Sequence, residues 1–196
     1  MLSAFLISAR RALKRFCCED RAAQIVEFAV SLPLLVVFVV GIFDFSSAIS
    51  LKQKLMTAAR EAARVAAADP ATDLEGAASG VPASVSDAKQ LVDNYLISEN
   101  INNCGFTTAA LNQTAGTMTW VATSNTGCPG TGINLQINRG CVTTVASGVT
   151  TVHVVDTCIT LSYAYNWRFN GVISLLGGNA RGSGTLTAKA EAFNEN

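Results

Sequence analysis

The chain has 196 residues, of which 14 are Lys or Arg and 14 are Asp or Glu, so its formal net charge is zero. This length suits one modest domain together with a membrane segment. The balanced charge gives no sign of a nucleic-acid partner, because nucleic-acid-binding domains usually carry a clear basic excess. The charge is unevenly distributed, however. The basic residues that precede the first long apolar run are Arg10, Arg11, Lys14, Arg15 and Arg21.

Residues 1–22 form a basic leader. Between Leu2 and Phe16 the apolar residues recur at helical spacing with the basic residues mostly opposite, which is typical of a short helix at a membrane surface. A leader that only sets membrane topology explains the same charges, and both interpretations stay open. A secretory signal peptide is a third interpretation. It is disfavoured because its basic region would be unusually long and because the residues Phe-Asp-Phe stand where a small-residue cleavage site would follow.

Residues 23–45 are predicted to form a transmembrane helix. No residue between Phe28 and Phe43 is charged, and with its flanks the run spans about 30 Å as a helix, enough to cross the hydrocarbon layer. A buried helix of a soluble core would usually show a polar face, and this run shows none. The positive-inside rule then places the N-terminus in the cytoplasm and the chain after Phe45 outside.

Glu27 and the helical pattern that directly follows the run set it apart from a simple anchor, and Pro33 bears on its shape. Pro33 removes a backbone donor from the helix interior, so we expect a bend near Pro33 or Gly41. Glu27 lies just inside the N-terminal end, where an ionised carboxylate costs about 3 kcal/mol unless it is paired or close to the interface. Pairing with Arg21 at the interface and pairing with a group of another subunit are both compatible with the residues alone.

Residues 46–68 continue the helical pattern as an extension of the same helix. Leu and Ala residues recur every three or four positions, and Asp69-Pro70 ends the helix because the residue before a proline avoids the α conformation. Such a stripe of small residues either packs against another helix or covers the chain's own domain, and we expect both along different parts of its length.

A linker over residues 69–86 is predicted to lead into a second helix. Ser86 is expected to cap that helix, which runs from Asp87 to Glu99. The residues expected on its buried face are Ala88, Leu91, Val92, Tyr95 and Leu96.

After Asn100 the pattern becomes that of β-strands, so residues 87–196 are expected to form an α+β domain with a small antiparallel sheet. The strands are predicted over residues 118–122, 132–138, 141–146, 151–165 and 184–193. In the longest of them, alternation places Ile159, Leu161 and Tyr163 on the core face. Residues 169–176 are a short apolar piece, either helical or a loop packed on the sheet.

The six cysteines divide by position. Cys17 and Cys18 lie on the cytoplasmic side, where thiols stay reduced, and the other four lie on the outer side, where disulfides persist. The four outer cysteines are Cys104, Cys128, Cys141 and Cys158. Four cysteines allow three pairings. We favour Cys104–Cys128 with Cys141–Cys158, because the last two fall on strands joined by a turn at residues 146–150.

No catalytic, cofactor or metal site is expected. The only histidine is His153, no CxxC pair occurs, and no Ser, Cys or carboxylate stands at a catalytic spacing from this histidine. Trp120 and Trp167 are interpreted as core aromatics. Two classes of function remain: a structural subunit that assembles through its helix, and an unprocessed single-pass protein that presents an adhesive or ligand-binding β domain.

Several groups of residues in and after the apolar run form a combined pattern. They are Val26-Glu27-Phe28, Leu32-Pro33-Leu34, Gly41-Ile42-Phe43-Asp44-Phe45, Leu55, and Ala58-Ala59-Arg60-Glu61-Ala62-Ala63-Arg64. The pattern resembles the N-terminal signature of the TadE-like family, the pseudopilins or minor pilins of the tight-adherence (Tad, Flp-type) pilus system. The resemblance covers about a quarter of the chain.

The resemblance implies that a prepilin peptidase removes the basic leader between Ala22 and Ala23, which makes Glu27 the fifth and Phe28 the sixth residue of the mature chain. Leaders in this system usually end in glycine, and this chain departs from that pattern at Ala22. The resemblance also implies a non-enzymatic protein of the bacterial inner membrane with a periplasmic or extracellular C-terminal domain. Its implied partners are other pilin or pseudopilin subunits and the Tad inner-membrane assembly complex. In that setting the new α-amine of one subunit would pair with Glu27 of a neighbour.

Overall fold

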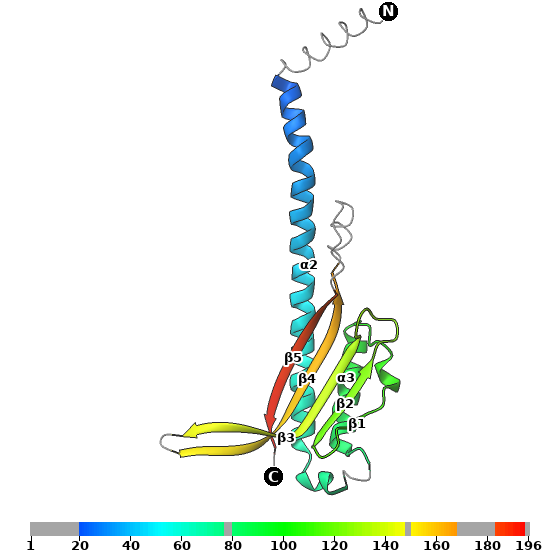
Figure 1. The fold of residues 1–196 in the computed structure, drawn as a ribbon, viewed down its shortest axis with the longest axis vertical. Coiled ribbons are helices and arrows are strands. Elements are labelled where there is room, and N and C mark those ends of the chain that lie inside the picture. Colours follow the sequence, from blue (N-terminus) through cyan, green and yellow to red (C-terminus); the bar gives the residue numbers. More distant parts are fainter. Residues whose placement is uncertain (1–19, 77–79, 148–149, 168–182, 195–196) are drawn as a thin grey trace, which may run out of the picture. The chain divides into compact units, whose positions relative to one another are not determined.

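The computed structural model describes residues 20–76, 80–147, 150–167 and 183–194. The chain divides into two compact units, Met1–Phe45 and Ser46–Asn196. The surface helix expected between residues 2 and 16 and the apolar piece at residues 169–176 lie outside the described residues. Figure 1 shows an α+β chain of long helix, shorter helix and antiparallel sheet, the fold class expected from the sequence.

Helix α2 extends from Asp20 to Ala68 as one element, with Pro33 inside it. The prediction of a single helix that continues past the apolar run is therefore confirmed. Ala, the best helix former, dominates its last third, and no turn signal occurs before the proline at position 70. The bend expected near Pro33 or Gly41 stays a prediction.

Helix α3 extends from Ala83 to Ser98 and follows a short 3-10 helix, η1 (Ala71–Gly76). The expected start at Asp87 with Ser86 as the cap is wrong. The free N–H groups of Ala83 and Ser84 instead donate to the two carboxylate oxygens of Asp73, at 3.1 and 3.0 Å. A local pattern cannot reveal a cap that lies ten residues upstream.

The sheet has five antiparallel strands in chain order, β1-β2-β3-β4-β5. Their bounds are Asn112–Gln113, Thr119–Ser124, Ile133–Ser147, Thr150–Asn166 and Ser183–Phe193. The two strands predicted at 132–138 and 141–146 are one strand, β3, interrupted by a bulge between Asn138 and Cys141. The sequence did not reveal β1 or a 3-10 turn, η2 (Phe106–Thr108), because both are too short to show a period.

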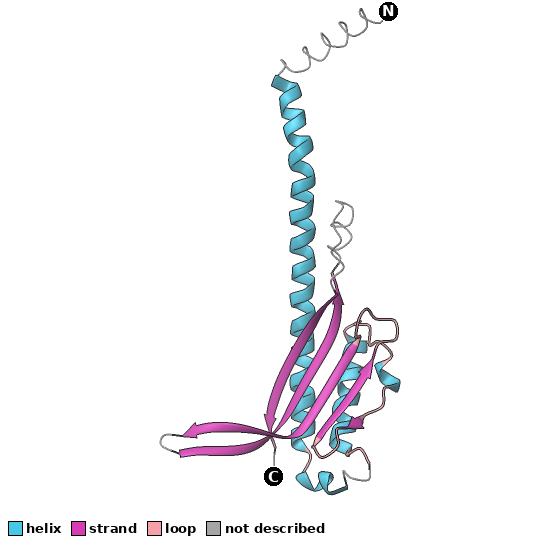
Figure 2. Cartoon of the chain, viewed as in Figure 1, coloured by secondary structure: helices cyan, strands magenta, loops and turns pink. Residues whose placement is uncertain are grey.

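Strands β3 and β4 continue beyond the other strands as a two-stranded ribbon (Figure 2). The pairing of β2 with β3 stops at Asn138 and that of β5 with β4 stops at Asp156, so residues 142–147 and 150–155 pair only with each other. The disulfide Cys141–Cys158 joins the two strands where the ribbon leaves the sheet. The ribbon is thus fastened at its base by a covalent bond.

The hydrophobic core of the second unit lies between one face of the sheet and the two helices. As predicted, Ile159, Leu161 and Tyr163 are buried on the core face of β4. The sheet residues that join them are Trp120, Ala122, Ile133, Leu135, Ile137, Ala188 and Ala190. Helix α3 contributes Val85, Ala88, Val92 and Leu96. Leu91 and Tyr95, expected on the same buried face of α3, are only partly buried.

Arg139, at the bulge of β3, is a buried cation. Its Nη2 donates to the carbonyl oxygen of Asp69 at 3.0 Å, just beyond the end of α2. Burial lowers the pKa of Arg139, against the opposing attraction of Asp73 and Asp69. For Asp73 burial acts to raise the pKa, but the bonds from Ser84 and Ala83 and the charge of Arg139 together lower it. These groups tie the end of α2, the start of α3 and the sheet together.

Candidate assembly site

The first unit presents an apolar surface that its own residues do not cover. The described part of the chain contains one helix long and apolar enough to cross a membrane, with a mean hydropathy of 2.6 and none of that window buried. Its exposed side chains include Ile25, Phe28, Leu34, Phe38 and Ile42. Burying such side chains is favourable by about 1.5–3 kcal/mol each, so this surface is suited to contact with lipid or with other helices.

Glu27 and Phe28 lie at the N-terminal end of this apolar surface and are both exposed. Phe28 retains 64% of its accessible surface, so its ring is free to pack against a neighbouring molecule. The predicted processing position, Ala22 and Ala23, lies within the first turns of α2. At the C-terminal end of the run, Asp44 differs from its exposed neighbours because it is only 3% exposed.

The stripe of small residues in the second half of α2 faces the chain's own domain. Leu55, Ala58, Ala59, Ala62 and Ala66 are completely buried and belong to the core against the sheet. Alanine at these positions lets the helix backbone approach the strands closely. Of the two roles expected for the stripe, the structure therefore shows the coverage of its own domain.

The charged residues of the same segment point the other way. Arg60, Glu61 and Arg64 are exposed, and Arg64 Nη1 lies 3.3 Å from Glu61 Oε1. An ion pair this exposed contributes little to stability. Among the described residues no salt-bridge partner is found for Arg60. The A-A-R-E-A-A-R segment thus combines alanines that build the core with charges on the exposed side of the helix.

A groove lies beside these charges, between α2 and α3. Its volume is about 580 Å³. Glu61 of α2 and Asp87 of α3 supply carboxylates, while Leu91 and Tyr95 of α3 supply apolar surface. The polar residues that complete its lining are Gln90, Asn94 and Ser98. A second groove of about 480 Å³ adjoins the first around α3, shares Gln90 and Asn94 with it, and includes Lys89 and Asp93.

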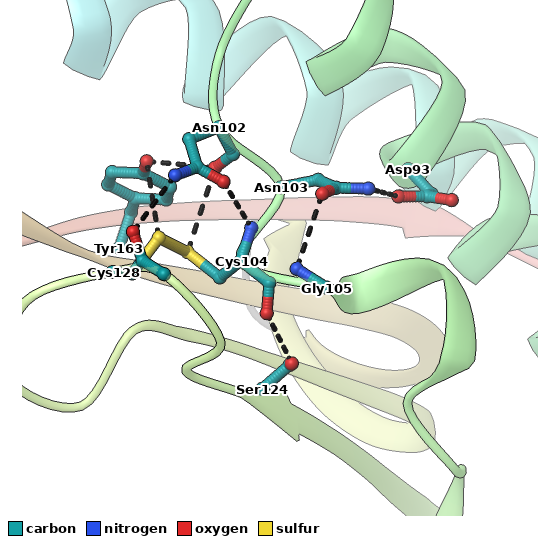
Figure 3. The surroundings of a disulfide bond; sticks show 9 residues. Asp93, Asn102, Asn103, Cys104, Gly105, Ser124, Cys128 and Tyr163 are labelled. Carbon is teal, nitrogen blue, oxygen red and sulfur yellow. Dashed lines mark hydrogen bonds between the residues drawn. A yellow bond between two sulfur atoms is a disulfide. The ribbon is translucent and has the colours of Figure 1, made fainter.

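The first disulfide has the favoured pairing, Cys104 with Cys128, and so does the second, Cys141 with Cys158. Figure 3 shows the surroundings of the first bond. Tyr163 Oη donates to the carbonyl oxygen of Asn102 at 2.8 Å, and Asn102 Nδ2 donates to Gly127 O at 3.0 Å. Burial raises the pKa of Tyr163.

Two consecutive asparagines fix the loop that carries Cys104. The Asn102 and Asn103 side-chain oxygens accept from the backbone N–H groups of Cys104 and Gly105. Cys104 and Gly105 both have positive φ angles, 55° and 72°. Asn103 Nδ2 also donates to Asp93 Oδ1 at 2.8 Å (Figure 3). These polar groups satisfy one another, so the cluster holds the loop on the sheet. The sequence signal, Asn-Asn before Cys, indicates such turns.

The remaining candidate residues occupy separate places. His153 lies in β4, but its side chain is outside what the structure describes. Trp120 is completely buried, as expected of a core aromatic, whereas Trp167 is only partly buried and meets Tyr165 edge to face, with ring centroids 5.0 Å apart. Within the described ranges no three His, Cys, Asp or Glu side chains are grouped in a way that suits a metal ion.

Comparison with known proteins bears on the helix alone. No curated protein matches the chain. No solved structure matches it either. The model of the family described as TadE-like protein matches residues 22–64, and this match confirms over that segment the resemblance seen in the sequence.

Proposed function

We propose that the chain is a non-enzymatic, pseudopilin-like component of Tad-type pilus assembly. It is anchored in the bacterial inner membrane by residues 23–45, with its N-terminus in the cytoplasm and its C-terminal domain in the periplasm or outside the cell. Its partners are other pilin or pseudopilin subunits and the inner-membrane complex of the system. The family match to residues 22–64, which carries the whole apolar helix and the charged segment after it, is the observation that supports this proposal most.

The exposed apolar helix supports an assembly role. Most of its large apolar side chains between Ile25 and Phe45 are exposed, and Glu27 lies among them without burial. In a membrane that carboxylate costs about 3 kcal/mol unless it is paired. A cationic α-amine on a neighbouring subunit removes this cost, provided that the leader has been cut off. Processing and pairing are therefore two parts of one proposal.

Processing by a prepilin peptidase is tested by the mass of the mature protein. We expect the chain purified from its native membrane to begin at Ala23, because this cut makes Glu27 the fifth residue. Intact mass spectrometry decides the question, with cells that lack the peptidase as the control. If cells with an active peptidase contain only protein that retains residues 1–22, the chain is an unprocessed anchor, which is the alternative function considered from the sequence.

The pairing of Glu27 is tested by a double-mutant cycle. Glu27→Gln should weaken pilus assembly without weakening membrane insertion, because a neutral amide enters the apolar layer more easily than a charge. An Ala22 substitution that blocks cleavage should have the same effect by withholding the amine. The combined variant should be hardly worse than either single one, because both delete one interaction. Normal piliation with Glu27→Gln, at a normal protein level, would favour an interaction of Glu27 with Arg21 instead.

A further inference from the structure

The two-stranded ribbon (Figure 2) has two outer edges that no described strand covers. Residues 142–147 of β3 pair only with residues 150–155 of β4. Unpaired N–H and C=O groups along a strand edge are a template for a further strand. Two strands alone are also marginally stable in water, so a third strand would stabilise the ribbon. The disulfide Cys141–Cys158 fastens its base, which lowers the entropy cost of pairing there.

The edge formed by β4 is the better of the two for adding a strand. β5 pairs with β4 without a register shift up to Asp156, where β5 contributes Phe193, and β4 then continues alone. On the other side, β3 contains the bulge between Asn138 and Cys141, and a bulge bends its strand and interrupts pairing. A strand added to β4 can therefore continue the line of β5, whereas the bulge interrupts the line of β2.

The direction of the backbone groups along β4 shows which of them lie on this edge. The N–H of Ala164 donates to the carbonyl oxygen of Gly132, on the side of β3, at 2.7 Å. Successive residues of an antiparallel strand direct their N–H groups to opposite sides. Even-numbered positions of β4 thus face β3, and odd-numbered positions face the line of β5. The backbone groups of Thr151, His153 and Val155 therefore lie on the outer edge.

The sequence of the ribbon lacks the charges that usually protect a strand edge. From Val142 to Val155 it contains no Asp, Glu, Lys or Arg. The two edges of the five-stranded sheet differ from it. β1 has only two residues, Asn112–Gln113, and β5 carries the exposed residues Lys189 and Glu191. Short strands and charged side chains both discourage pairing with another chain. The ribbon is thus the edge of this sheet that is open to pairing.

Exposed apolar side chains beside the β4 edge indicate what kind of strand it accepts. Val155 is 53% exposed and Phe193, the last residue of β5, is 62% exposed. Apolar side chains at alternate positions of an added strand would pack against them, as cross-strand neighbours do. A second copy of the chain fits less well. Antiparallel pairing of two such edges centred on His153 sets Val155 of each copy opposite Thr151 of the other, so the apolar positions do not meet.

We propose that the ribbon is a docking site for an extended, uncharged segment of another polypeptide, with apolar side chains at alternate positions. The segment adds to β4 along residues 150–155 and continues the line of β5. Its main-chain hydrogen bonds supply the affinity, and its contacts with Val155 and Phe193 supply the specificity, as in other cases of strand addition. This site goes beyond the proposed function and does not rest on it.

Amide hydrogen exchange with a designed strand tests the docking site. The probe is the capped peptide Lys-Thr-Val-Thr-Val-Thr-Val-Lys, added to the purified full-length protein in detergent and followed by NMR. At saturation, exchange at Thr151, His153 and Val155 should slow about ten-fold, because these N–H groups gain acceptors. Exchange at Lys189 and Glu191, which the same alternation places on the outer edge of β5, should not change. The matched control peptide, with proline at each valine position, should protect none of them because it lacks the donors.

A charge placed on the edge tests the same site through affinity. Val155→Lys keeps the backbone groups but replaces an exposed apolar side chain by a cation, so it should weaken binding of the fluorescently labelled probe about ten-fold in anisotropy measurements. Thr123→Lys introduces the same charge at an exposed position of β2 and should bind as the unmodified protein does. Equal affinity of the Val155→Lys and Thr123→Lys proteins would overturn the assignment of the edge.

The exchange experiment also separates the competing occupants. Protection of the edge amides without peptide, increasing with protein concentration, would mean that two copies pair and would overturn the proposal. Absence of protection by the peptide, or equal protection by its proline control, would overturn it as well. The purified chain is measured without other pilus components. Failure here therefore leaves the pilus function standing, and an uncleaved leader with normal piliation in Glu27→Gln leaves the docking site standing.

Discussion

Replacement of Ala62 by leucine should destabilise the C-terminal unit. Ala62 is completely buried where α2 meets the sheet, and Ala62→Leu adds three carbon atoms to a filled core. Overpacking of this kind costs about 1–3 kcal/mol. For a unit of this size, that corresponds to a fall of roughly 3–10 °C in Tm. The substitution changes no charge, and the difference in helix propensity between alanine and leucine is small compared with this cost of overpacking.

Thermal unfolding followed by tryptophan fluorescence measures this effect, because Trp120 lies in the same core. Ala68→Leu is the matched control: the same change at an exposed position of the same helix should shift Tm little. The reasoning fails if Ala62→Leu unfolds at the wild-type temperature but no longer supports pilus assembly. That result would mean that the alanine stripe contacts another subunit and not its own sheet.

Two further predictions concern the cross-links and the cap of α3. Replacing Cys104 and Cys128 together by serine opens a loop with a sequence separation of 24 residues and should lower the free energy of unfolding by about 3.5 kcal/mol. Urea denaturation in detergent measures this change. An unchanged midpoint would show that the disulfide does not stabilise the unit. The pKa of Asp73 is lowered from 3.8 in the folded chain. The ionised Asp73 carboxylate therefore stabilises the fold at pH values above 3.8, and this stabilisation is lost as the pH falls through the lower pKa of the folded state. Asp73→Asn should therefore be less stable at neutral pH and lose less stability on acidification, and parallel Tm–pH curves for the two proteins would contradict this role.

The long helix was predictable because every signal for it is local. The apolar run, the alanine-rich continuation and the stop before Pro70 all act within a few residues, and α2 spans Asp20–Ala68 accordingly. The core face of β4 followed from alternation alone, and the strand–turn–strand pattern around residues 146–150 favoured the pairing of Cys141 with Cys158. The direction of the alanine stripe did not follow, because the same spacing suits a sheet and a second helix.

The features that the sequence did not reveal depend on contacts between distant residues. Asp73 caps α3 from the preceding loop. From its charge alone, Arg139 would be expected on a solvent-exposed face. In the structure it lies at the bulge of β3, and its guanidinium donates a hydrogen bond to the carbonyl oxygen of Asp69, just beyond the end of α2. The groove beside Glu61 arises only when α3 packs next to α2. For the candidate site, the sequence therefore identified the apolar helix and its carboxylate, whereas the groove came from the packing.

If the C-terminal domain is exported as proposed, the order of the sheet bears on how it matures after crossing the membrane. Each strand pairs with the strand just before it, and the disulfide loops, Cys104–Cys128 and Cys141–Cys158, follow one another without overlap. A segment that emerges from the translocation channel thus finds its partner already present, and the first cross-link can close before the second pair of thiols arrives. Such local, sequential pairing favours rapid folding. We expect a domain built in this way to form its native pairs without a disulfide isomerase, provided that oxidation keeps pace with export.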